Sequence, residues 1–225
     1  MTVFEFFIQN YGLILSLTWQ HIEIVAVSVG LAVLTGVPIG IAITLNRRAA
    51  ITILYLASIV MTIPSIALFG IMIPILSMIN EGIGYVPTVI AVLLYSQLPI
   101  IRNTYVAING IDPALREAAR GMGMRPLQRL RQIEIPLAVP VIMTGIRVAV
   151  VINIGVTTIA AYIGAGGLGD LISQGIAQTD PRELISGSIA VSLLAVAADY
   201  LLLFVQYCFT PVGLRSRHSG LRGAA

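Results

Sequence analysis

Long apolar segments separated by short polar ones make up most of the chain. A helix that crosses a membrane needs about 20 predominantly apolar residues. Five segments fit this pattern: 24–45, 51–79, 86–101, 137–161 and 184–209. The second is long enough to tilt or kink, and the third is shorter but can extend at both ends. The pattern predicts an all-α integral membrane protein with five transmembrane helices.

Composition supports this prediction and excludes other classes. Of 225 residues, 57% are hydrophobic and 10% are charged, against roughly 25% charged in a soluble domain. The single cysteine, Cys208, cannot form an internal disulfide. His21 and His218 lack the spacing of metal ligands, and no nucleophile lies in a pattern with a base. We therefore expect one membrane domain, with no metal site and no enzyme active site.

The basic residues are all arginines, and they predict an orientation. Eleven of the thirteen fall in three polar segments: Arg47, Arg48, Arg102, Arg116, Arg120, Arg125, Arg129, Arg131, Arg215, Arg217 and Arg222. Positively charged segments between spans face the cytoplasm. Because these arginines are interleaved with spans, they do not suggest a nucleic-acid-binding patch. The N-terminus and segments 80–85 and 162–183 then lie outside, and the C-terminus lies inside.

Three regions follow from this topology. Residues 1–20 are rich in aromatic side chains, contain Glu5 and lack a basic start, so we expect an external segment on the membrane surface and not a cleavable signal peptide. Residues 21–211 form the transmembrane domain, with a cytoplasmic loop at 102–136. Residues 212–225 form a cytoplasmic tail.

The cytoplasmic loop carries signals for a short helix that projects from the membrane. Asp112 can cap a helix and Pro113 suits its first position. Residues 114–120 favour a helix, and Gly121 and Gly123 end it. Pro126 then opens a second helix, and Pro136 starts the next span.

The loop resembles the EAA loop of permease subunits of binding-protein-dependent ABC importers. That loop reads E-A-A, three residues, G, nine residues, I-x-L-P, and this chain matches it with isoleucine at the leucine position. The resemblance implies a cytoplasmic coupling helix that docks in a cleft of a separate ATPase, and a type I ABC importer fold similar to methionine permeases. The implied coupling residues are Glu117, Ala118, Ala119, Gly121, Gly123 and Pro136.

The same resemblance implies the partners. They are two ABC ATPase subunits, which bind ATP and Mg, a second permease that is identical or paralogous, and an extracytoplasmic substrate-binding protein. The permease itself would bind no cofactor. Its place would be the bacterial cytoplasmic (inner) membrane.

A glycine-rich segment follows the fourth span on the outer side. It is not a phosphate-binding loop, because no Lys-Ser/Thr follows it and no strand precedes it. We expect an outer gate or docking turn in which glycine permits close backbone approach. Its residues are Tyr162, Gly164, Gly166, Gly167 and Gly169.

This segment, with residues 17–21, 62–68 and 158–163, is similar to the osmoprotectant branch of these permeases, which moves glycine betaine, carnitine or choline. Methionine importers have a similar glycine run, so a permease for methionine or another amino acid is the alternative. A channel or secondary carrier, and a membrane-embedded enzyme, are less consistent with the EAA loop and with the lack of an internal repeat or catalytic pattern.

Two charges lie inside predicted spans, Arg147 and Asp199. Each is about ten residues from the inner end of its span, which puts both at a depth of about 15 Å. We expect them to pair and stabilise the bundle, in preference to a proton relay or substrate site.

Prolines in the second and third spans suggest kinked helices. These are Pro64, Pro74, Pro87 and Pro99. Kinks are common in membrane bundles, but they also occur where helices line a pathway. On the second interpretation, the pathway is lined by Pro64, Ser65, Phe69 and Tyr95.

Overall fold

The computed structural model describes residues 2–210, and every regular element in that range is helical. In chain order the elements are α1 Val3–Gln9, α2 Tyr11–Ala42, η1 Ile43–Leu45, α3 Arg47–Thr62, α4 Ser65–Ser77, α5 Tyr85–Asn109, α6 Pro113–Gly121, α7 Pro126–Arg129, η2 Leu130–Glu134, α8 Ile135–Ile159, η3 Ala160–Ile163, α9 Gly169–Ala177 and α10 Pro181–Phe209. The all-α prediction is confirmed. The expected cytoplasmic tail, with Arg215, Arg217 and Arg222, lies outside the described residues.

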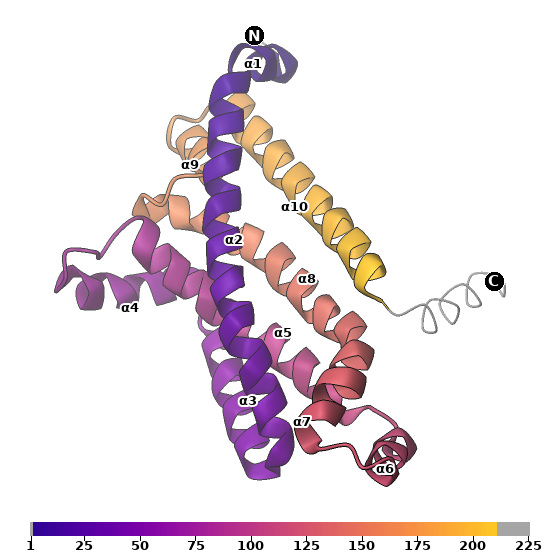
Figure 1. Cartoon of the computed structure of the whole chain (residues 1–225). Coiled ribbons are helices and arrows are strands. Elements are labelled where there is room, and N and C mark those ends of the chain that lie inside the picture. Colours follow the sequence, from indigo (N-terminus) through magenta and orange to yellow (C-terminus); the bar gives the residue numbers. More distant parts are fainter. Residues whose placement is uncertain (1, 211–225) are drawn as a thin grey trace.

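The spanning helices agree with the predicted pattern, with one large difference. Within residues 2–210, four helical segments are long and apolar enough to cross a membrane: Tyr11–Leu45, Tyr85–Asn109, Pro126–Ile163 and Pro181–Phe209. The second predicted span is instead two helices, α3 and α4, that meet at an angle of 97°. Counting this broken pair as one span gives five. Figure 1 shows α4 projecting sideways from the bundle.

The core of the molecule lies between α2, α5 and α8. It includes Val29 of α2, Val92 and Ile100 of α5, and Ala149 of α8, all buried. Glycine allows the close approach at one point of the α5–α8 contact: a Cβ on Gly145 would lie 2.7 Å from the Pro99 carbonyl oxygen. Small residues at helix contacts are the usual means of packing helices in a membrane, where the hydrophobic effect contributes little.

The break between α3 and α4 has a local and a tertiary cause. Proline disfavours helical backbone in the residue before it, and Ile63 is extended, with ψ 127°. The Tyr95 hydroxyl of α5 donates a hydrogen bond to the Ile63 carbonyl oxygen, which the break leaves without a helical partner. The remaining prolines do not break their helices: Pro74 and Pro99 lie inside α4 and α5, and Pro87 lies in the first turn of α5.

Two of the four residues expected to line a pathway are buried within the chain. Phe69 is 1% exposed and Tyr95 is 5% exposed, and both belong to one buried cluster between α4, α5 and η3. Pro64 is exposed and Ser65 is half-buried at the start of α4. The two aromatic side chains therefore hold α4 against the bundle and do not face an open path.

Two boundaries differ from those expected. The expected surface segment 1–20 is divided, because only α1 is a separate short helix and α2 already begins at Tyr11. Helix α5 continues to Asn109, so the first part of the expected loop 102–136 belongs to a spanning helix. In Figure 1, α1 and α9 lie at one end of the molecule, and α6, α7 and the turn from α2 to α3 lie at the other.

Candidate functional site

Helix α6 is a short, independent helix whose ends are built as the sequence predicts. Asp112 caps it, and its carboxylate accepts a hydrogen bond of 2.9 Å from the Ala114 amide. Pro113 occupies the first turn. The chain turns away at Gly123, whose φ of +78° suits glycine, and its amide donates to the Arg120 carbonyl oxygen. The helix is therefore set by its own caps.

The expected coupling residues lie mostly on the free surface of this helix. Glu117, Ala118, Gly121 and Gly123 are exposed, whereas Ala119 is fully buried. A Cβ added to Gly123 would have no neighbouring atom within 4 Å. Figure 1 shows α6 set apart from the long helices at one end of the molecule. This surface is accessible to a partner.

The segment after α6 is more continuous than expected. Helix α7 passes through a five-residue π-helix, η2, directly into α8, and Pro136 lies in the first turn of α8. The separate second helix expected between Pro126 and Pro136 is therefore the base of the next span. A π-helical turn in an otherwise α-helical run is rare and is frequently found at functional sites.

Glu134, the last residue of η2, was not identified from the sequence. Its side chain is buried and lies 2.8 Å from Arg129 Nε and 3.3 Å from Arg116 Nε. The acid stands between the two isoleucines of the EAA loop's last motif, in a position the resemblance leaves open. The sequence places both arginines in the same loop as Glu134. However, the separation of Arg116 and Glu134 along the chain gave no reason to pair these two residues.

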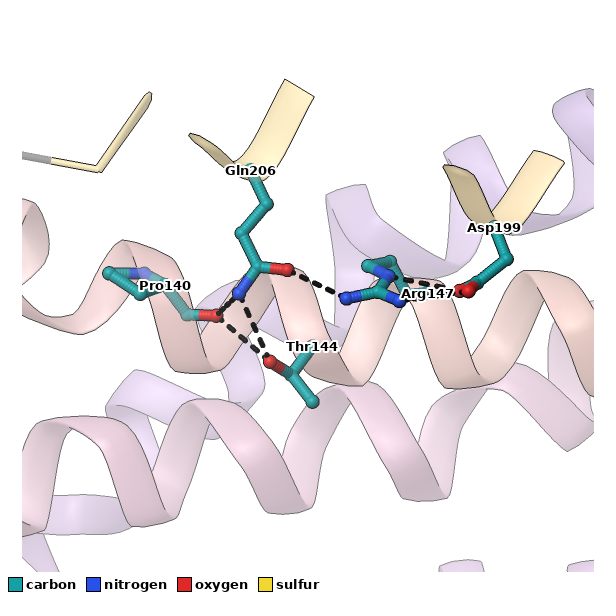
Figure 2. A network of polar contacts seen from close by, with 5 residues as sticks. All are labelled: Pro140, Thr144, Arg147, Asp199 and Gln206. Carbon is teal, nitrogen blue, oxygen red and sulfur yellow. Dashed lines mark hydrogen bonds and ion pairs between the residues drawn. The ribbon is translucent and has the colours of Figure 1, made fainter. Parts of the chain in front are cut away.

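Arg147 of α8 and Asp199 of α10, which were paired by depth, are in contact. Arg147 Nη2 lies 2.8 Å and 2.9 Å from the two carboxylate oxygens, and Arg147 Nε donates to Oδ1 at 3.0 Å. Figure 2 shows this double contact beside a third residue, Gln206, whose side-chain oxygen accepts from Arg147 Nη1 at 3.1 Å. The guanidinium is thus bonded on all three of its nitrogens.

Gln206 extends the pair into a ladder along the two helices. Its Nε2 donates to the Pro140 carbonyl oxygen at 2.8 Å and to the Thr144 hydroxyl at 3.3 Å. Thr144 also donates to the Pro140 carbonyl oxygen (Figure 2). Gln206 was missed in the sequence, although it lies seven residues after Asp199 and a separation of seven keeps two residues on one helix face.

The ladder borders a groove between α8 and α10 of about 520 Å³. Its lining combines Arg147 and Asp199 with Thr144, Tyr200 and apolar side chains. Because the ion pair is already satisfied within the chain, the geometry favours a structural tie over a proton relay. Residues 2–210 contain no group of His, Cys, Asp and Glu side chains that could hold a metal ion.

The glycine segment after η3 packs tightly against α2. Gly164, Gly166 and Gly167 all have positive φ, from 77° to 81°. The Gly167 amide donates to Gln20 Oε1 at 3.2 Å, and a Cβ on Gly167 would lie 3.1 Å from His21 Nδ1. Gly169 opens α9 in a space too small for a Cβ, whereas Tyr162 is 58% exposed. The segment is a closely packed turn with one free aromatic ring.

His21 is the residue that the turn covers. It is fully buried, and its Nε2 lies 3.1 Å from the Ile154 carbonyl oxygen of α8. The histidine therefore joins α2, α8 and the glycine turn at one point. This role was not evident from the sequence, which showed only that His21 has no partner at metal-ligand spacing.

Two acids near this turn, Asp170 and Asp180, have different surroundings. Asp180 is bonded by the Arg182 side chain, and these hydrogen bonds lower its pKa to about 2. Burial raises the pKa of Asp170 in α9. Arg182 pairs with Asp180. Its positive charge therefore does not balance the other acidic side chains of these segments.

We predict that single alanine substitutions in the ion pair destabilise the bundle. Arg147→Ala or Asp199→Ala leaves one charge unpaired in the membrane, which costs about 3 kcal/mol. Each should lower the yield of monodisperse protein extracted from membranes, and the double variant should recover part of the loss. Gln206→Ala keeps the ion pair and should cost less. Losses that simply add in the double variant would show that the pair contributes no coupling.

Comparison with known proteins agrees with this architecture. Residues 36–211 match the family described as the binding-protein-dependent transport system inner membrane component. The chain is 52% identical to the osmoprotectant import permease protein OsmW of Salmonella typhimurium, over 96% of this chain and 100% of that protein. It is 40% identical to the choline transport system permease protein OpuBB of Bacillus subtilis, over 95% of this chain and 96% of that protein.

A solved structure shows the same fold. A chain of the MetNI methionine ABC transporter, in an inward-facing conformation, aligns with a TM-score of 0.80 at 22% identity, over 89% of this chain and 98% of that chain. At this identity the likeness concerns the fold, and it confirms the predicted type I ABC importer permease architecture. The chain belongs to the family of inner-membrane permease components of binding-protein-dependent ABC importers.

Proposed function

We propose that this permease forms the translocation pathway for osmoprotectants such as glycine betaine, carnitine or choline. The main support is its 52% identity, over 96% of its length, to a protein named as an osmoprotectant import permease. The choline permease at 40% identity supports the same class of substrate. Methionine is the alternative solute, and the methionine transporter resembles this chain in fold at lower identity.

The energy for transport comes, in this proposal, from separate ATPase subunits that bind ATP and Mg. The observation that carries the proposal is α6, an exposed helix with the spacing of the EAA loop, set apart from the spans at one end of the molecule (Figure 1). The exposed Glu117 and Ala118 would enter a cleft of the ATPase. Two permeases, identical or paralogous, would then move together as the ATPases close.

The opposite end of the molecule would receive substrate from an extracytoplasmic binding protein. At this end Gly167 of the glycine turn donates to Gln20 of α2, and Tyr162 is exposed. A transport cycle requires that ATP and the loaded binding protein favour different conformations, since a ligand shifts an equilibrium only by its differential affinity. The outer turn and α6 are the two surfaces through which these partners would act.

We predict that Glu117→Lys and Gly123→Asp abolish import without preventing membrane insertion. The first reverses a charge on the exposed face of α6, and the second forces a side chain into a backbone conformation with φ +78°. Import and co-purification of the ATPase should both be lost, while membrane levels stay normal. Arg131→Gln, an exposed change in η2, serves as the control. Normal uptake by Glu117→Lys would contradict a coupling role for α6.

Uptake of labelled solutes in a deletion strain tests the substrate. We expect import of at least one of glycine betaine, carnitine and choline to be lost and to return when the gene is restored. Import should also require the ATPase and the binding protein. If methionine uptake alone is lost, the substrate assignment fails and the methionine alternative replaces it.

We propose that the N-terminus is outside and the C-terminus inside. The arginines of the α2–α3 turn and of α6 and α7 lie at one end of the molecule (Figure 1), as the positive-inside rule requires. Reporter fusions after Phe209 should behave as cytoplasmic, and fusions within 172–180 as external. The reverse pattern would overturn this orientation.

A further inference from the structure

A buried acid at the base of α8 links the exposed loop to the spanning helices. Glu134 is 4% exposed, and a carboxylate at such a site is costly unless it is paired. Its two ion-pair partners are Arg129 and Arg116, both through Oε1. The side chains of Arg129 and Arg116 are 18% and 27% exposed, so water weakens these contacts only in part.

The two contacts differ in what they connect. Arg129 lies five residues before Glu134 in the same continuous helical run, and five is the separation that a π-helical hydrogen bond spans. This contact therefore stays within one rigid element. Arg116 belongs to α6, a different helix, and its Nη2 also donates to the Ile108 carbonyl oxygen near the end of α5. Arg116 thus joins α6 to both α5 and α8.

Apolar packing gives α6 little other attachment. The structure describes every residue of α6, and the buried one among them is Ala119. An alanine side chain contributes only a small apolar surface. The turns before and after the helix contain Gly110 and Gly123. If α6 moved in the absence of the Arg116–Glu134 ion pair, these turns would bend and α8 would stay in place.

We propose that Glu134 is a positioning residue that, through Arg116, makes α6 move together with α8 and α5. The inference rests on the proposed role of α6 as the docking helix for the ATPase. It assigns to one carboxylate the step between movement of the docked helix and movement of the spans. Losing this contact should allow the ATPases to turn over without moving the pathway.

The test uses the complete transporter, reconstituted in proteoliposomes with its ATPase and binding protein. ATP hydrolysis and import of the solute identified above are both measured per assembled complex. Glu134→Gln and Arg116→Gln should retain binding-protein-stimulated hydrolysis and lower the number of molecules imported per ATP about tenfold, which lies within the usual range of a coupling free energy between two sites. The double variant should be close to the lower of the two single variants, because each single variant already removes the Arg116–Glu134 contact.

Arg129→Gln is the matched control, since it removes an arginine from the same carboxylate without breaking the link between helices. Its import per ATP should stay within about twofold of the wild type. An equal effect of Arg129→Gln and Arg116→Gln, or hydrolysis and import that fall in proportion, would overturn the proposal. If Glu134→Gln does not assemble, Arg116→Gln decides, because it leaves the acid paired with Arg129.

The Glu117→Lys variant tests the docking role of α6 separately from the role of Glu134. If it abolishes import while Arg116→Gln keeps the wild-type ratio, α6 docks the ATPase but Glu134 does not transmit its movement. If Glu117→Lys leaves import unchanged, α6 is not the docking helix, and the role given to Glu134 is overturned with it.

Discussion

The structure depends on the need to satisfy every backbone polar group away from water. Within a bilayer this requirement restricts spanning segments to helices unless other groups complete the hydrogen bonds. Two departures from a regular helix here have such a group. The Tyr95 hydroxyl bonds the Ile63 carbonyl at the α3–α4 break, and Gln20 accepts from Gly167 in the glycine turn. Within the regular α8, Gln206 adds a bond to the Pro140 carbonyl. The irregular points are therefore also the points where distant helices are tied together.

These ties explain how much of the architecture the sequence predicts. Spans, caps and the exposed loop follow from local patterns, because hydrophobic runs, Asp112-Pro113 and the loop glycines act on their own neighbourhood. Depth along a helix is also local, since each residue adds a fixed rise, and it was enough to pair Arg147 with Asp199. The prediction of an all-α permease fold needed nothing further.

What could not be predicted depends on the rotation of each helix and on contacts distant in sequence. Four prolines in two spans looked equivalent, yet only Pro64 lies at a break, because its neighbour Ile63 meets the hydroxyl of Tyr95. The rotation of α4 and α5 was also not evident from the sequence. Phe69 and Tyr95 were therefore expected to line a pathway, whereas both are buried. Glu134 and Gln206 were missed because each derives its role from partners on another element.

The distribution of polar ties also indicates which helices move together. The buried residues of α10, which is fully described, are Ser186, Gly187 and Ala190, all near its start. Farther along, Asp199 and Gln206 add polar contacts to α8 beside apolar side chains such as Leu194 and Ala198, which pack against the core. Figure 1 shows α10 diverging from α2 in this part. Because α8 begins at η2, displacement of the loop would reach α10 through the base of α8. A helix joined to α8 by both apolar packing and polar contacts is suited to follow α8 as a unit.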